Sequence, residues 1–312
     1  MTLESKSGKS PDGGASPEIF VHVGLHKTGT TFLQRNVFSR WPGISFYNAN
    51  IPILPFLGSL GSRKILISNE SLWCNTERWK CAAVDSWASY GNPRLVEESL
   101  AALRNLFPDA RILMSFRRHS SFVLSLYLQY LHQGGTEEFQ RFFDFTGNQG
   151  LLNKHHISFQ HVVEVVESLF ANPPFLFLQE ELHDDLSGTL SQIGRFLGSP
   201  PPGTEQLRKQ GWCSRATRKN NRSVGYYQAK ILRRLNRLTR SVYNPRGILP
   251  LSLVSHLRMH PRRLCQRTLF AWLLPYRPVR LDEGVRQAID NHFRADWQYI
   301  IRRKAEIDSM LA

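Results

Sequence analysis

A short apolar run that leads into a glycine- and threonine-rich loop is the feature that most restricts how this chain can fold. Residues 19–23 are rich in β-branched and aromatic side chains, and the loop Gly-Leu-His-Lys-Thr-Gly-Thr-Thr follows at residues 24–31. A helical pattern then covers residues 32–38. This order predicts strand, loop and helix. Because the loop amides and the positive end of the helix dipole point to one place, the segment predicts a site for a phosphate-like anion.

The rest of the chain repeats the alternation of apolar strands and amphipathic helices. Three further strands are predicted at residues 64–68, 111–116 and 175–178. Helical patterns cover residues 94–107, 122–132, 159–170 and 186–197, and, without any recognisable strand beyond residue 202, residues 226–239 and 281–311. Such alternation indicates parallel βαβ units around a buried sheet. The expected fold is therefore α/β and P-loop-like, with three layers, a central mainly parallel sheet and a helical C-terminal extension.

Composition and charge set the expected domain organisation. Residues 1–17 have no apolar run and are expected to be a disordered tail, ahead of a single domain at 18–312 with its core at 18–203 and a basic helical part at 204–312. No apolar stretch reaches the roughly 20 residues that a membrane span needs, and no secretory signal is recognisable, so we expect a soluble, cytoplasmic protein without a transmembrane segment.

The positive charge is concentrated in one part of the chain. The formal net charge is +15, and residues 206–281 hold 18 Lys and Arg but no Asp or Glu. This bias favours a polyanionic ligand or surface, such as a nucleotide, an acidic glycan, nucleic acid or anionic lipid. The alternative is a solvated basic face that only aids solubility.

The loop differs from that of nucleotide-hydrolysing enzymes. There a lysine follows the second glycine, whereas here Thr30 holds that position and Lys27 lies two residues before Gly29. The strand at 111–116 runs into Arg117 and Arg118 instead of a metal-holding acidic residue. We therefore expect arginine, and no metal, to neutralise the phosphate charge.

Two motifs carry a resemblance to a known family. The segment His-Lys-Thr-Gly-Thr-Thr-Phe-Leu at 26–33 resembles the 5′-phosphosulfate loop of the sulfotransferases that use 3′-phosphoadenosine 5′-phosphosulfate (PAPS). Arg117 and Ser125, eight residues apart, match the family's second element. Residues 66–70 and 178–198 are similar to further segments of carbohydrate-type and bacterial members, so the resemblance spans about 18–225.

The resemblance implies sulfuryl transfer from PAPS to a hydroxyl acceptor, with release of adenosine 3′,5′-bisphosphate. By the same resemblance, Lys27 bridges the phosphate and sulfate oxygens, and Arg117 and Ser125 hold the 3′-phosphate. The co-substrate loop comprises His26, Lys27, Thr28, Gly29, Thr30 and Thr31. Glu70, just beyond a strand, is the favoured catalytic base, as in glycan-type members; its alternative role is a helix cap or the partner of a surface arginine. His22 and His26 are the other candidates for the base.

The family pattern is not matched everywhere. Its second motif usually reads RNPxD, but Arg118, His119 and Ser121 here occupy the places of its Asn, Pro and Asp, which predicts a differently built turn. The third nucleotide clamp of cytosolic members has two candidates, Arg208 with Lys209, or Arg218 with Lys219 and Arg222.

The acceptor and the rival functions remain open at this stage. Glu70 favours a carbohydrate hydroxyl, and the basic C-terminal part favours an acidic or glycan acceptor. One rival is a nucleotide kinase or NTPase with an atypical loop, and another is a sulfotransferase-like protein that binds the nucleotide without chemistry. A third is a protein whose segment 206–281 docks on nucleic acid or on a membrane surface. The sequence has no recognisable RNA-binding or zinc motif, so it does not indicate specific nucleic-acid recognition. Peripheral contact with a membrane stays open as an alternative.

Overall fold

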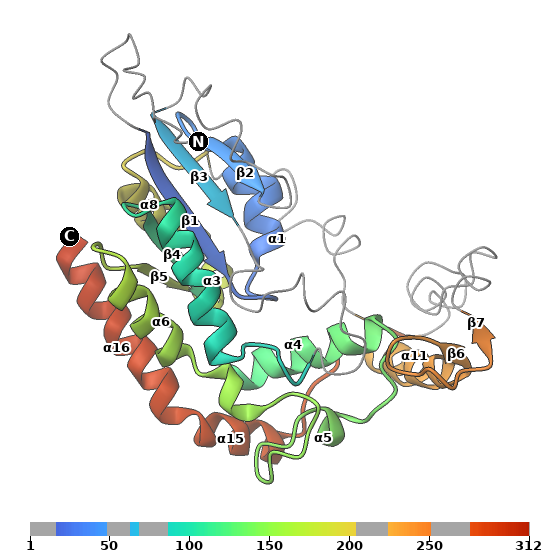
Figure 1. Cartoon of the computed structure of the whole chain (residues 1–312). Coiled ribbons are helices and arrows are strands. Elements are labelled where there is room, and N and C mark those ends of the chain that lie inside the picture. Colours follow the sequence, from blue (N-terminus) through green and yellow to red (C-terminus); the bar gives the residue numbers. More distant parts are fainter. Residues whose placement is uncertain (1–16, 49–62, 69–86, 204–223, 251–274, 312) are drawn as a thin grey trace, which may run out of the picture.

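The computed structural model describes residues 17–48, 63–68, 87–203, 224–250 and 275–311. A parallel sheet lies at the centre, with the strand order β2-β3-β1-β4-β5 (Figure 1). Its strands are β1 (Glu18–Gly24), β2 (Ser45–Asn48), β3 (Lys64–Ser68), β4 (Arg111–Phe116) and β5 (Phe175–Leu178). The four strands predicted from the sequence are confirmed, and β2 is added at the edge, where its short and polar-ended segment carries no clear apolar signal.

Helices cover both faces of this sheet. One face is covered by α3 (Pro93–Leu106), α6 (Phe159–Leu169) and α16 (Arg294–Leu311). The other is covered by α1 (Thr30–Phe32) with the helical turns Leu33–Val37 and Phe38–Arg40, and by α7 (Gln179–Asp184) and α8 (Leu186–Leu197). Strand side chains alternate between the faces: Val21 and Val23 join the first core cluster, and Phe20 joins the second. The α/β prediction with three layers is therefore confirmed.

The last third of the described chain packs around α4 (His119–His132). Helix α15 (Glu283–His292) lies against α4, while α16 returns to α6 and β5. Helix α11 (Tyr226–Leu238) also packs on α4, and its buried Asn236 donates to the carbonyls of Leu131 and Gly135, each over 2.8 Å. The segment predicted as one helix at 281–311 is thus two helices, separated at Phe293.

A second, two-stranded sheet corrects the expectation that no strand follows residue 202. Strands β6 (Thr239–Arg240) and β7 (Leu249–Pro250) pair in parallel beyond α11. Two residues are too few to give an alternating pattern, which is why the sequence did not predict them. The side-chain amide of Asn244 holds this region by donating to the carbonyls of Asn236, Arg237 and Thr239.

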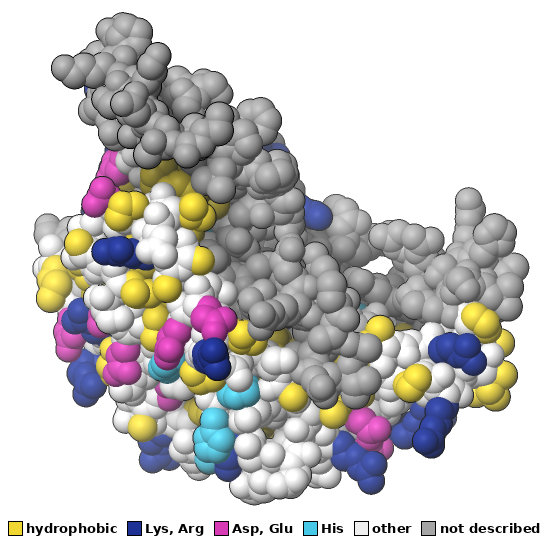
Figure 2. All heavy atoms as spheres, viewed as in Figure 1, with side chains coloured by type: hydrophobic (Ala, Val, Ile, Leu, Met, Phe, Trp, Pro, Cys, Tyr) yellow, Lys and Arg dark blue, Asp and Glu magenta, His cyan; other side chains and the backbone are white. Residues whose placement is uncertain are grey.

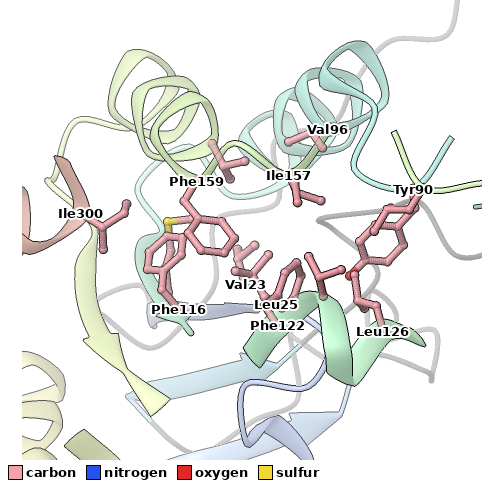
Figure 3. Packing of buried hydrophobic residues seen from close by; sticks show 14 of the residues in the cluster. Val23, Leu25, Tyr90, Val96, Phe116, Phe122, Leu126, Ile157, Phe159 and Ile300 are labelled. Atoms are coloured by element: carbon pink, nitrogen blue, oxygen red, sulfur yellow. The ribbon is translucent and has the colours of Figure 1, made fainter. Parts of the chain in front are cut away.

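An aromatic-rich core lies below the carboxyl ends of the strands. Figure 3 shows Leu25 of the glycine-threonine loop pointing into this core beside Phe122 and Leu126 from α4. Leu25 is 1% exposed, so the loop is anchored at its first residue after β1. None of the helices in the described ranges is long and apolar enough to cross a membrane.

Candidate functional site

The loop after β1 and the arginine after β4 lie at the same edge of the sheet. Strands β1 and β4 are neighbours, and Gly24 pairs in register with Ser115. From β1 the chain proceeds toward β2 and β3, and from β4 it proceeds to β5 on the other side. The carboxyl ends of β1 and β4 therefore form the topological switch point, which is where open α/β sheets bind their ligands.

The loop backbone adopts left-handed conformations at two residues, Lys27 (φ 67°) and Gly29 (φ 89°). For a lysine this conformation costs roughly 1–2 kcal/mol relative to a right-handed one, while its side chain is exposed. Gly24 allows the loop to close tightly, because a Cβ atom there would lie 2.7 Å from Thr30 Oγ1 and 2.9 Å from the His22 ring. The loop thus presents the charge of Lys27 outward from a tightly packed base.

The three threonines of the loop divide into two roles. Thr28 and Thr30 are buried, and their hydroxyls donate to the Leu25 carbonyl over 2.7 and 3.3 Å. They support the loop from inside, although the resemblance placed both residues in the co-substrate loop. Thr31 is exposed at the start of α1. The hydrogen bonds of this helix begin with Phe32 N and Leu33 N, which both donate to Gly29 O. The amides of Thr30 and Thr31 lie ahead of these bonds, where the first N–H groups of a helix have no partner within the helix.

Arg117 joins the two motifs that the sequence singled out. Its Nη1 donates to the Lys27 carbonyl and to Ser125 Oγ, each over 3.1 Å. Burial lowers the pKa of the Arg117 guanidinium below its usual value, and the nearby Glu180 carboxylate offsets this lowering only in part. A guanidinium stays charged at neutral pH even so. The structure therefore places a fixed positive charge between the loop and the second turn of α4.

The residues that follow β5 also reach this edge, although sequence reasoning gave them no role. Glu180 Oε1 accepts a hydrogen bond from the backbone N–H of Arg118 over 3.0 Å. A Cβ atom on Gly29 would lie 4.0 Å from Gln179 Cγ, so Gln179 borders the loop. The available signal was their position directly after an apolar strand, at the carboxyl edge of a parallel sheet.

The two histidines proposed as bases lie in different environments. His22 is fully buried, with Nδ1 2.8 Å from Ser68 Oγ and Nε2 3.4 Å from Ser115 Oγ, and burial lowers its pKa to about 3. His26 is partly exposed beside the Tyr90 ring. Its pKa is lowered to about 4, mainly by burial and to a smaller extent by the positive charge of Lys27. Because both ring nitrogens of His22 face protein groups, His26 is the better placed of the two to meet a substrate.

The turn after Arg117 is held by the C-terminal helices. The His119 ring is stacked between Phe159 and Phe293, with centroid distances of 4.1 and 4.5 Å, and its Nε2 lies 2.9 Å from Asp296 Oδ2. Asp290 Oδ1 accepts a hydrogen bond from Ser120 N over 3.3 Å. Carboxylates from α15 and α16 thus hold the turn that follows Arg117.

Several predicted residues lie outside the described part of the chain. These are Glu70 and both candidates for the third clamp, Arg208 with Lys209 and Arg218 with Lys219 and Arg222. Within the described ranges, no group of three or more His, Cys, Asp and Glu side chains is close enough to hold a metal ion.

Comparison with known proteins gives matches among solved structures only. No family model matches the chain, and no curated protein matches it. A sulfotransferase from Alicyclobacillus acidocaldarius is 16% identical over 63% of this chain and 90% of its own, with a TM-score of 0.44. Mouse sulfotransferase SULT7A1 complexed with PAP is 17% identical over 66% of this chain and 67% of its own, with a TM-score of 0.40.

Proposed function

We propose that this protein is a sulfotransferase that transfers the sulfuryl group of PAPS to a hydroxyl acceptor and releases adenosine 3′,5′-bisphosphate. The observation that carries the proposal is the position of Arg117, whose guanidinium contacts both the Lys27 carbonyl and Ser125 Oγ over 3.1 Å. The two motifs that resemble the phosphate-binding elements of this family therefore meet at one end of the sheet. Lys27 and Arg117 supply two positive charges for a ligand that carries several negative ones.

The reaction assigns a separate task to each group. The acceptor oxygen attacks the sulfur, a base takes the acceptor's proton, and the bond from sulfur to the bridging phosphate oxygen breaks. Negative charge then grows on that phosphate, and a preorganised cation stabilises it best where water is excluded. Lys27 has this role in our proposal, with the amides of Thr30 and Thr31. Arg117 and Ser125 bind the 3′-phosphate, and these protein cations replace a metal ion.

Glu70 is our proposed base, and His26 is the alternative. A carboxylate beyond the end of β3 would belong to the same sheet edge as the loop. The imidazole of His26 is neutral at pH 7, because its pKa is lowered to about 4, but the same lowering makes it a weaker proton acceptor than an ordinary histidine. Glu70→Gln is expected to keep nucleotide affinity and to lower turnover by about 10²–10⁴-fold. Loss of nucleotide affinity instead would make Glu70 structural and leave His26 as the base.

The acceptor is proposed to be a carbohydrate hydroxyl, in the cytoplasm, on an acidic or membrane-associated molecule. The support is electrostatic: Lys230, Arg234 and Arg237 of α11 are exposed. Figure 2 shows Lys and Arg side chains gathered over α11 and β6 on the face that it displays. Such a field would concentrate an anionic acceptor near the molecule.

Calorimetric titration tests the donor site directly. The full chain is titrated with adenosine 3′,5′-bisphosphate in the presence of a chelator, and separately with ATP and magnesium. We expect metal-free binding that weakens about 10–100-fold in Arg117→Ala, the range for losing hydrogen bonds to a charged group. Arg104→Ala is the matched control, because Arg104 is exposed near the end of α3, at the opposite end of the sheet.

Two other results would replace the proposal. Preference for ATP with magnesium would favour the kinase or NTPase alternative. Absence of nucleotide binding, together with steeply salt-dependent binding to RNA or to anionic vesicles, would favour a binding protein.

A further inference from the structure

A row of buried polar side chains crosses the sheet directly below the glycine-threonine loop. Ser68 on β3, His22 on β1 and Ser115 on β4 come from three adjacent strands, and Thr28 continues the row into the loop. All four side chains are 0% exposed. Buried polar groups need hydrogen-bond partners, so the row has to satisfy itself.

The contacts form one continuous chain of hydrogen bonds. Gln34 Nε2 donates to Ser68 Oγ over 3.0 Å, and Ser68 Oγ lies 2.8 Å from His22 Nδ1. His22 Nε2 lies 3.4 Å from Ser115 Oγ, which lies 2.7 Å from Thr28 Oγ1. Thr28 Oγ1 in turn donates to the Leu25 carbonyl over 2.7 Å. The chain therefore links the helical turn after the loop to the loop itself through the sheet.

The two ends of the chain fix the direction of every bond in it. A hydroxyl has one proton to donate. Thr28 spends its proton on a carbonyl, so it accepts from Ser115, and Ser115 must then accept from His22 Nε2–H. A neutral ring with its proton on Nε2 leaves Nδ1 to accept from Ser68. Ser68 is then the acceptor for the Gln34 amide, whose Oε1 accepts from Asn48 Nδ2 over 3.4 Å.

The surroundings of His22 fit this neutral form. The ring lies edge-on to Phe38 at 5.2 Å and stacks on Phe177 at 6.0 Å between centroids. A charged imidazolium would have to be desolvated among these rings. It would also donate from both nitrogens, which reverses the bond with Ser68. One tautomer therefore satisfies all the contacts.

We propose that His22 is a positioning residue, which as a neutral Nε2–H imidazole holds Ser115 and Thr28 in one hydrogen-bond direction and thereby fixes the loop around Lys27. The fixed loop is what keeps Lys27 in its left-handed conformation, with the side chain outward. Its effect on donor binding rests on the proposed function. The tautomer and the ordering of the loop hold for any ligand that the loop takes.

Nitrogen NMR of the full-length protein with ¹⁵N-labelled histidine tests the tautomer at pH 7. We expect the His22 signals of a neutral ring protonated at Nε2. A ring protonated at Nδ1, or at both nitrogens, would overturn the proposal. This measurement uses the wild-type chain and so does not depend on a variant that folds.

The positioning role is tested with Ser115→Ala, which breaks the chain between His22 and Thr28. We expect faster hydrogen exchange of the amides of residues 27–30 and about tenfold weaker binding of adenosine 3′,5′-bisphosphate. The matched control is Ser191→Ala, since Ser191 is exposed on α8 and its hydroxyl donates only to Ser187 O, in the same helix. Unchanged amide exchange in Ser115→Ala would refute the positioning role.

The two proposals fail separately. If the wild-type protein binds no nucleotide but shows the Nε2–H tautomer and a loop that loosens in Ser115→Ala, the proposed donor is wrong and the role of His22 stands. If the nucleotide binds but the tautomer differs, the role of His22 is wrong and the proposed function stands.

Discussion

Lys27 has a strained backbone conformation, and contacts with neighbouring residues fix its position. Its φ of 67° is one of two positive values at non-glycine positions in the described residues, and its carbonyl accepts from Arg117. A residue kept in this region needs support from its neighbours. Here Thr28 is fixed below it and Gly29 turns the chain into α1 behind it. The strained backbone thus agrees with a role in which the Lys27 ammonium group has to point toward a ligand.

We predict that Lys27→Ala lowers turnover with PAPS about 100-fold, the scale for losing one preorganised donor of positive charge. The effect should fall on kcat more than on the KM for the donor, because charge on the leaving phosphate is greatest in the transition state. Steady-state kinetics with a saturating acceptor measure both constants. Turnover within threefold of the wild type would remove Lys27 from the reaction, and Arg104→Ala controls for loss of an exposed cation.

The orientation of the loop threonines shows where residue-level prediction ends. The sequence indicated that the segment 24–31 binds an anion and that Arg117 and Ser125 belong with it, and the structure brings these groups together. It did not indicate that Thr28 and Thr30 face inward. Their side chains are held by Leu25 and Ser115, and Ser115 is 87 residues from Thr28 in sequence. No local pattern encodes such a partner.

For helices and strands, the apolar periodicity of the sequence predicted which segments form packed elements. It did not predict which other elements they pack against. Strands β1, β3, β4 and β5 were predicted from their apolar runs. In the structure these runs are mostly buried, since the strands of a parallel sheet are covered on both faces. Helix α16 was predicted as part of one mixed-charge helix, without a binding surface. In the structure Asp296, at its start, accepts from Ser158 Oγ, Phe159 N and Gln160 N at the start of α6.

The carboxylate of Asp296 therefore ties three elements together, namely α16, α6 and the start of α4. Burial acts to raise its pKa, but hydrogen bonds with His119 and with the amides of Gln160 and Phe159 outweigh burial, and the pKa lies below its usual value. The carboxylate is consequently ionised at neutral pH, next to an imidazole that is 1% exposed.

We predict that Asp296→Asn lowers the free energy of unfolding by about 3 kcal/mol, because the Asp296 carboxylate accepts three hydrogen bonds from the start of α6 and a hydrogen bond to a charged group is worth about 1.5–3 kcal/mol. The midpoint of urea denaturation at pH 7 measures the change. Asp184→Asn is the matched control, because Asp184 also neighbours a histidine, His183, but both side chains are about 80% exposed. Equal midpoints for the two variants would show that α16 does not depend on this contact.

For the whole molecule, several histidines have pKa values below the usual value of about 6.5 in the folded state. Burial lowers the pKa of His22 to about 3 and is the main cause of the lowering to about 4 at His26. Burial also lowers the pKa of His156 and His292. The unfolded chain binds protons at these sites before the folded chain does. Stability that is complete above pH 6.5 is therefore lost as the pH falls toward 4.

Acidic side chains lose their contribution in a different window. The pKa of Asp144 and that of Glu283 are lowered to about 2, chiefly by side-chain hydrogen bonds from Thr146 and Arg286 respectively. Groups of this kind stabilise the folded state above the usual carboxyl pKa near 4 and lose that effect below it. The range from pH 6.5 to 4.5 therefore reports mainly on the histidines.

We predict that the free energy of unfolding falls by about 2 kcal/mol between pH 7 and pH 5 from His22 alone, since each pKa unit is worth about 1.4 kcal/mol. His26, which is partly exposed, should add less. Urea denaturation at the two pH values measures the difference. His26→Gln should reduce the difference, because His26 is one of the histidines whose pKa is lowered by burial. Equal stability at both pH values would mean that His22 is not buried as a neutral ring, which would also remove the basis for its role under the loop.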